Sequence, residues 1–182
     1  MESMVRYISI FVFALLLVGC KNRINSSDFS DRHSESYIKL RIDSIYSRFN
    51  NPTYNENGKR IIDYRYNYDS AFCSSHYKKL MSKAIELMDD EEDIILEHDH
   101  WTNSQDPEDF TYKINKIEKT TDSTAIVVLN ASNWGDDYLV TLRLLYERED
   151  WFVDDFITKY GFKSEKAYLN DYIKKHTYTS VH

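Results

Sequence analysis

Two histidines that lie two positions apart in this 182-residue chain are of a residue type that can bind a metal ion. His98 and His100 would point the same way on an extended segment, where they could share one metal ion. Glu97 and Asp106 could then serve as further ligands. A His-x-His pair is weak support for a metal site when no third histidine follows closely, and we therefore expect neither a metal nor another cofactor.

A structural interpretation fits the same segment better. The side chains of Asp99, Asn103 and Asp106 would cap backbone N–H groups of an exposed loop, while Trp101 would pack on the core. The alternative is a binding pocket on this segment. The residues that could line it are Asp99, Trp101, Gln105 and Asp106.

Asp154 and Asp155 form a second candidate site. Adjacent residues of a strand face opposite sides, so we expect one carboxylate to point outward and the other towards the concave face of a sheet. A carboxylate in an apolar pocket has a raised pKa and could act as a general base, paired with Asp99 or Asp106. The structural alternative is a hydrogen bond to the backbone near the last strand.

Cys73 could act as a nucleophile with His76 as its base, because the two would share a helical face. A buried small apolar residue followed by a surface histidine is the simpler interpretation.

The acidic run 89–93 lacks the spacing of a calcium-binding loop and is typical of a solvated helix start. A Gly-rich phosphate loop, a Gly-x-Ser-x-Gly elbow and a Cys-x-x-Cys pair are also missing from the sequence, so no catalytic signature points to an enzyme.

The charge balance excludes general nucleic-acid binding, because 30 acidic residues outnumber 23 basic ones and the net charge is −7. An acidic surface can steer a basic partner.

The chain also has 15 tyrosines. Those that cluster are Tyr54, Tyr64, Tyr66 and Tyr68. They could form a protein- or glycan-binding face or could pack with hydrated hydroxyls, and the sequence leaves both open.

The N-terminus carries an apolar run, residues 8–18, which would span roughly 16 Å as a helix, about half of the ~30 Å hydrocarbon core of a bilayer. Its length suits a signal peptide better than a transmembrane anchor. The run ends in the tetrad Leu17, Val18, Gly19 and Cys20. This tetrad resembles the lipobox of bacterial lipoproteins. The resemblance implies cleavage before Cys20, a diacylglyceryl group on its sulfur and an acylated amino terminus, by which the chain would bind a lipid bilayer. The alternatives are an ordinary cleaved signal or an uncleaved anchor.

The residues after the tetrad bear on location. Surface-exported lipoproteins carry an acidic cluster directly after the acylated cysteine, and no such cluster follows Cys20. We therefore expect the chain to lie in the cell envelope, anchored in the outer membrane and facing the periplasm. We predict a signal peptide over 1–19, a flexible tether over 20–34, one domain over 35–176 and a tail over 177–182.

Apolar spacing predicts a helix over 35–49, a second from 64–70 to about 88, a short helical turn over 91–96 and a closing helix over about 164–174. From Phe110 the apolar period changes to two, and turns near 121–123, 133–136 and 147–150 separate four strands. We therefore predict an α+β fold, in which N-terminal helices pack on one face of a curved antiparallel sheet of about four strands, followed by a C-terminal helix.

This order of elements resembles a bacterial lipoprotein family described as domain of unknown function 3828, which is itself similar to the nuclear-transport-factor-2-like (cystatin-like) superfold. The matching segments are 45–49, 72–84, 99–106, 142–146 and 151–156. The resemblance implies the fold and the envelope address but no activity. It also implies a cone-shaped pocket between sheet and helices.

Three functions are consistent with these observations. The first, which we favour, is a non-enzymatic lipoprotein whose domain binds an unknown protein or small ligand, for example as an immunity protein against a toxin delivered to the envelope. The second is a pocket enzyme that uses Asp99, Asp106 and Asp154 or Asp155 for acid–base chemistry. The third is a homodimeric structural component of the envelope.

Overall fold

The computed structural model of the chain describes residues 31–50, 53–54, 56–57, 60–61, 67–88, 94–105, 107, 109–157 and 164–179. The elements in chain order are α2 (Glu35–Asn50), β1 (Thr53–Tyr54), β2 (Arg60–Ile61), α3 (Tyr68–Phe72), α4 (Ser75–Glu86), β3 (Thr111–Lys119), β4 (Thr124–Asn133), β5 (Asp136–Glu147), β6 (Asp150–Ile157) and α5 (Glu165–Thr179). β1 and β2 form a small antiparallel pair that was not predicted. The lipobox residues Leu17, Val18, Gly19 and Cys20 lie outside the described residues.

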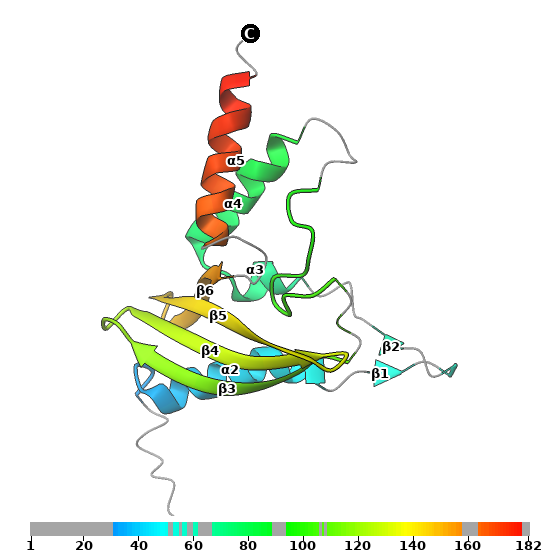
Figure 1. Ribbon diagram of the computed structural model, residues 1–182. Coiled ribbons are helices and arrows are strands. Elements are labelled where there is room, and N and C mark those ends of the chain that lie inside the picture. The colour runs from blue at the N-terminus through cyan, green and yellow to red at the C-terminus, as the bar shows by residue number, and fades with distance from the viewer. Residues whose placement is uncertain are drawn as a thin grey trace, which may run out of the picture.

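Four strands form one antiparallel sheet in the order β3-β4-β5-β6, as predicted (Figure 1). Two of its hairpins turn on residue pairs with positive φ, Trp134 with Gly135 and Arg148 with Glu149. Two-residue turns of this hand match the right-handed twist of the strands that they join. Helices precede and follow this meander, so the predicted α+β class is confirmed.

α2 lies along one face of the sheet (Figure 1). Ile38 and Ile42, one helical turn apart, are fully buried and share one apolar core with Val127 and Leu129 of β4. On β4, buried residues alternate with half-exposed ones. The helical period that predicted α2 and the two-residue period of burial along β4 are therefore the periods by which the two elements face each other.

The prediction of one continuous second helix is wrong, because the helix is interrupted between α3 and α4. Cys73 forms a parallel bridge with Val153 of β6, and the Ser74 N–H donates to the Val153 carbonyl over 2.8 Å. Ser74 is extended, with φ −63° and ψ 158°, and is the N-cap of α4. Two residues of the predicted helix thus extend the sheet edge, and the helix restarts after them.

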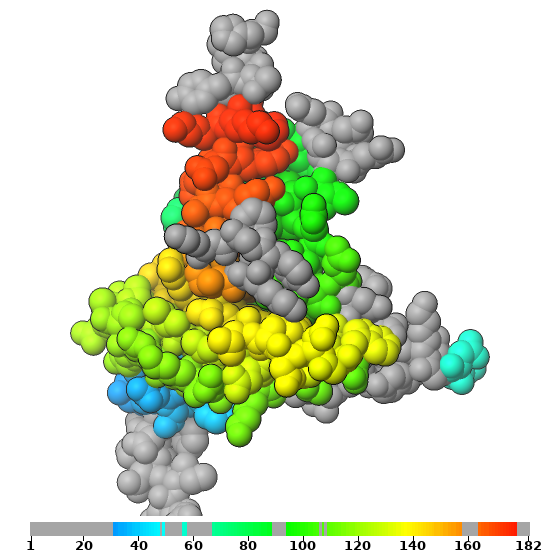
Figure 2. Space-filling model, in the orientation of Figure 1, coloured from blue at the N-terminus to red at the C-terminus, as the bar shows by residue number. Residues whose placement is uncertain are grey.

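α4 and α5 leave the sheet from their N-terminal ends and run side by side in roughly the same direction (Figure 1). In the space-filling view α5 and the segment around 94–105 stand above the broad surface of β3, β4 and β5 (Figure 2). α5 is longer than predicted. Ile85 of α4 is 55% exposed although its side chain is apolar, and the described residues 94–96 do not form the predicted helical turn.

The two edges of the sheet, at β3 and β6, differ in what covers or protects the outer strand. β6 is flanked by the extended pair Cys73 and Ser74. β3 carries exposed lysines at 113, 116 and 119, and its register with β4 shifts between Ile114 and Lys116, as at a β-bulge. Lysines and bulges on an outer strand oppose pairing with another chain. Within the described ranges, no helix has the length and apolar character needed to cross a bilayer.

Candidate functional site

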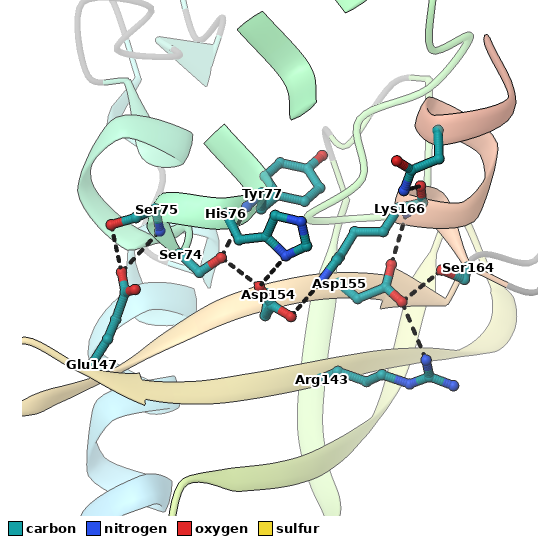
Figure 3. Close-up of polar contacts among 11 residues, drawn as sticks. Ser74, Ser75, His76, Tyr77, Arg143, Glu147, Asp154, Asp155, Ser164 and Lys166 are labelled. Atoms are coloured by element: carbon teal, nitrogen blue, oxygen red, sulfur yellow. Dashed lines mark hydrogen bonds and ion pairs between the residues drawn. The ribbon is translucent and has the colours of Figure 1, made fainter. Parts of the chain in front are cut away.

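The adjacent aspartates of β6 support the starts of α4 and α5 (Figure 3). Asp154 accepts a 2.6 Å hydrogen bond from the hydroxyl of Ser74, which in turn accepts a backbone N–H of the first turn of α4. Asp155 accepts a 2.7 Å hydrogen bond from the hydroxyl of Ser164, which accepts a backbone N–H of the first turn of α5. Both carboxylates therefore lie at the positive ends of helices, where negative charge is stabilising.

Lys166 joins the two aspartates. Its ammonium group binds Asp154, and its backbone N–H donates to Asp155 over 3.0 Å. The strict alternation expected for this pair is wrong, because the register of β5 and β6 slips by one residue after the pair of Arg143 and Asp155. Asp154 is the extra residue of a β-bulge, which re-aims a side chain, so that both carboxylates reach the start of the same helix.

A second polar cluster, which was not predicted, lies inside the domain. His100 is 8% exposed, and its Nε2 lies 2.9 Å from Oδ1 of Asp69 on α3. Its Nδ1 lies 3.2 Å from Oε1 of Glu165, the fully buried first residue of α5. The hydroxyl of Tyr77 on α4 donates to the same Glu165 oxygen, and Trp101 Nε1 donates to Asp69 Oδ1 over 2.8 Å. We call these five residues the buried network; it ties α3, α4, α5 and the segment 94–105 together.

The charges of the buried network follow from its pKa shifts. Burial alone would lower the pKa of His100, but hydrogen bonds and negative charges from Asp69 and Glu165 raise it to about 10. The ring is therefore an imidazolium at neutral pH. Burial alone would raise the pKa of Asp69, but its hydrogen bond to His100 and the imidazolium charge lower it. Burial, followed by the charge of Glu165, raises the pKa of Tyr77 far above its ordinary value, so the tyrosine keeps its proton and donates it in a hydrogen bond.

The predicted cap at Asp99 is confirmed. The predicted cap at Asn103 is wrong, because the side-chain oxygen of this residue is buried and accepts no hydrogen bond from the described part of the chain, and the predicted exposure of the loop is also wrong. Asp99 Oδ1 accepts the backbone N–H groups of Trp101 and Thr102 over 2.7 and 3.2 Å. Residues 100–103 are nonetheless buried, with Trp101 3% exposed. The reason is an antiparallel bridge between Asp99 and Ser104, which closes the loop and turns its side chains into the core.

A groove of about 450 Å³ opens beside the buried network. The residues that line it are Asn67, Tyr68, Asp69, Met81, Ile85, Leu96, His98, Asp99, His100 and Trp101. Its lining combines an apolar wall, the aromatic rings of Tyr68 and Trp101, and the carboxylate of Asp69, whose side chain is 34% exposed. The structure thus brings together four of the residues weighed from the sequence, namely His98, Asp99, His100 and Trp101, and adds Asp69 from α3.

The remaining predicted residues lie elsewhere. Gln105 is exposed and donates to the carbonyl of Glu97 over 3.2 Å, and Asp106 lies outside the described residues. Asp154 and Asp155 do not line the groove. Tyr68 is half-buried and stacks on Phe49 with ring centroids 4.9 Å apart, which is core packing on one side and groove lining on the other. Tyr64 and Tyr66 lie outside the described part of the chain, as does the side chain of Tyr54.

Cys73 and His76 do not form a nucleophile and base. The Cys73 thiol is fully buried, and burial, reinforced by the charges of Asp69 and Glu165, raises its pKa far above the ordinary value. His76 is 58% exposed and faces Asp154 at 3.9 Å. This arrangement matches the simpler interpretation of a buried apolar cysteine next to a surface histidine.

Sequence reasoning missed Asp69, Tyr77 and Glu165. Each sits in the first turn of a short or unremarkable helix, where an acidic residue or a tyrosine is ordinary. Only the fold brings these helix starts to His100. A weak signal was available at Glu165, which follows a capping serine directly.

His100 has both ring nitrogens directed at carboxylates, so as an imidazolium it offers no lone pair to a metal ion. Among the described residues, no group of three or more His, Cys, Asp and Glu side chains is placed to hold a metal. The chain matches no protein-family model, and neither a curated protein nor a solved structure shows significant similarity to it.

Proposed function

We propose that this chain is a bacterial lipoprotein, anchored in the cell envelope through acylated Cys20, whose α+β domain binds a ligand or protein partner without catalysing a reaction. The observation that carries the binding part is the groove beside Asp69, which combines an apolar wall with a carboxylate. Mixed lining of this kind is typical of binding sites, where apolar area gives affinity and a few polar groups give orientation.

Two observations support binding over catalysis. Asp154 and Asp155, the carboxylates proposed for acid–base chemistry, bind the capping serines of α4 and α5 and lie outside the groove. His100, the one imidazole of the buried network, is an ion held between two carboxylates and cannot accept a further proton. One concrete form of the proposal is an immunity protein for a toxin that acts in the envelope, since an acidic chain would attract a basic toxin.

The anchor is tested by labelling growing cells with an alkyne analogue of palmitate and measuring the intact mass of the purified protein. We expect label on the wild-type chain, loss of residues 1–19, and neither change in a Cys20→Ala variant. An unlabelled chain that keeps its first segment would overturn the anchor.

Binding is tested by placing a photo-crosslinking amino acid at Ile85 in the groove or, as a control, at Glu118 on exposed β3. We expect a discrete crosslinked species in envelope membranes from the position at 85 alone. Equal crosslinking at both positions, or none at either, would contradict binding through the groove.

A further inference from the structure

We propose that the groove binds an organic cation, a primary ammonium or guanidinium group carried on an alkyl stem. This inference rests on the proposed function and specifies the chemistry of its ligand.

Asp69 supplies the anionic end of the site. Its Oδ1 accepts hydrogen bonds from His100 Nε2 and Trp101 Nε1, at 2.9 and 2.8 Å. Within the described part of the chain, its Oδ2 accepts no hydrogen bond, and the side chain is 34% exposed at the groove. A carboxylate has about four acceptor positions, so Asp69 can still take a charge-assisted hydrogen bond from a ligand. His100 and Trp101 hold the carboxylate in a fixed orientation for that contact.

The local charge favours a positive ligand. The buried network contains two carboxylates, Asp69 and Glu165, and a single imidazolium, His100. Asp99 adds a third carboxylate at the groove, although burial raises its pKa. Burial lowers the pKa of His98, so that ring is neutral. Neither lysine nor arginine is among the described residues that line the groove. The buried network and the groove lining together therefore contain one imidazolium and three carboxyl groups.

The walls suit the uncharged part of such a ligand. The rings of Tyr68 and Trp101 have centroids 6.2 Å apart and planes inclined at 50°, and both line the groove. Aromatic faces attract ammonium and guanidinium groups. Of the two rings, half-buried Tyr68 is the one that a ligand can reach, because Trp101 is 3% exposed. Met81 and Ile85 of α4 and Leu96 form the apolar wall, against which an alkyl stem can lie while its charged head reaches the carboxylate.

Other ligand classes fit less well. An anion would be repelled by Asp69 and Asp99. A neutral apolar ligand would remove water from Asp69 without replacing its hydrogen bonds, which costs free energy. An alkyl cation compensates for that loss.

The test uses the full chain with Cys20→Ser and measures binding of hexylamine, 1-hexanol and hexanoate by calorimetry and by the His100 ring signals in NMR. We expect hexylamine to bind at least about tenfold more tightly than hexanol, a difference of ~1.4 kcal/mol. Added salt should weaken hexylamine binding, and the His100 signals should shift because its partner Asp69 is engaged. Equal binding of hexylamine and hexanol, or tighter binding of hexanoate, would overturn the inference.

Asp69→Asn would disturb the buried network, so the variant of choice is Ile85→Lys. Ile85 is 55% exposed, and a lysine there would place a competing cation in the groove without entering the core. We expect at least about tenfold weaker binding of hexylamine. The matched control is Leu139→Lys, 54% exposed on β5 and outside this groove, which should leave binding unchanged. Unchanged binding in Ile85→Lys would contradict the proposed site.

A short peptide with one lysine between two leucines separates the two sources of such a cation. Tighter binding of the peptide than of hexylamine identifies a partner's side chain, and the reverse identifies a free amine. A partner crosslinked at position 85 in membranes together with failure of every cationic probe would leave the proposed function standing and reject the cation.

Discussion

Glu165 Oε1 lies 3.2 Å from Nδ1 of His100, and the glutamate is fully buried although it begins a helix. The contact fixes the start of α5 to the segment 94–105 and, through the imidazolium, to Asp69 of α3. A buried charge can be held in this way only if its partner remains, because an unpaired ion in the interior is costly.

Removal of Glu165 should therefore destabilise the domain strongly. In the full chain with Cys20→Ser, we expect Glu165→Ala to lower the free energy of unfolding by about 3–5 kcal/mol, because His100 loses one of its two counter-charges. Urea denaturation measures the loss. Glu35→Ala, which removes an exposed acid from the first turn of α2, should cost far less. Equal effects of the two variants would show that the buried pair does not stabilise the fold.

The stability should depend on pH through His100. Its pKa in the folded chain is raised to about 10 from 6.5, so between these values the folded state binds more protons than the unfolded state. The contribution of His100 is thus fully present below pH 6.5 and is lost as pH rises through 10, with a slope of at most about 1.4 kcal/mol per pH unit. Unfolding at several pH values measures this slope, and NMR of the His100 ring should show no titration near pH 6.5. A ring that titrates there would disprove that Asp69 and Glu165 hold His100 as an imidazolium.

The capping serines should matter more than a serine inside a helix. Ser74→Ala removes the N-cap of α4 and a partner of Asp154, with an expected cost of about 1–2 kcal/mol. Ser164→Ala should behave alike at α5. Ser82→Ala, at an exposed position of α4, should be neutral or slightly stabilising. Chemical denaturation of the three variants checks the order, and a cost for Ser82→Ala equal to the others would contradict the role of the caps.

The hairpin residue Trp134 should be replaceable with a gain in stability. It has φ +54° and is 63% exposed, a backbone conformation that asparagine adopts more readily than tryptophan. We expect Trp134→Asn to raise the free energy of unfolding by roughly 1 kcal/mol. Leu139→Asn removes a similarly exposed apolar side chain from a strand and should not stabilise. Loss of stability in Trp134→Asn would mean that the indole packs on the protein.

Cys73 should be unreactive in the folded protein. With Cys20 replaced by serine it is the remaining thiol, fully buried and with a raised pKa. We expect no modification by a disulfide reagent over minutes in buffer and complete modification in concentrated urea. Rapid reaction of the native chain would indicate local opening between α3 and α4.

The sheet and the outer helices could be predicted from sequence because each depends on local periodicity. Alternation from Phe110 together with the turns near 121–123, 133–136 and 147–150 identified β3 to β6, and the spacing of Ile38 and Ile42 identified α2. The break at Cys73 and Ser74 could not be predicted, because the residues have acceptable helical propensity and only their pairing with Val153 draws them to the sheet. Asp154 illustrates the same limit, since a single extra residue in β6 changes where its carboxylate points.

The candidate site was predicted in part. The segment around Asp99 and Trp101 was singled out by residue type, and it does line a groove. The imidazolium of His100 was not foreseen, because its counter-charges Asp69 and Glu165 come from two other elements. Contacts between segments distant in sequence leave no spacing that could reveal them.

The lysine-bearing, bulged outer strand β3 has a consequence for a chain confined to two dimensions. Lipoproteins anchored in one leaflet collide with their own copies far more often than the same molecules would in solution. An outer strand without lysines or a bulge would pair with the outer strand of a neighbour and join the two sheets. On the anchoring that we propose, β3 would let neighbours collide repeatedly without sticking, so the protein could be packed densely in its membrane and still diffuse singly.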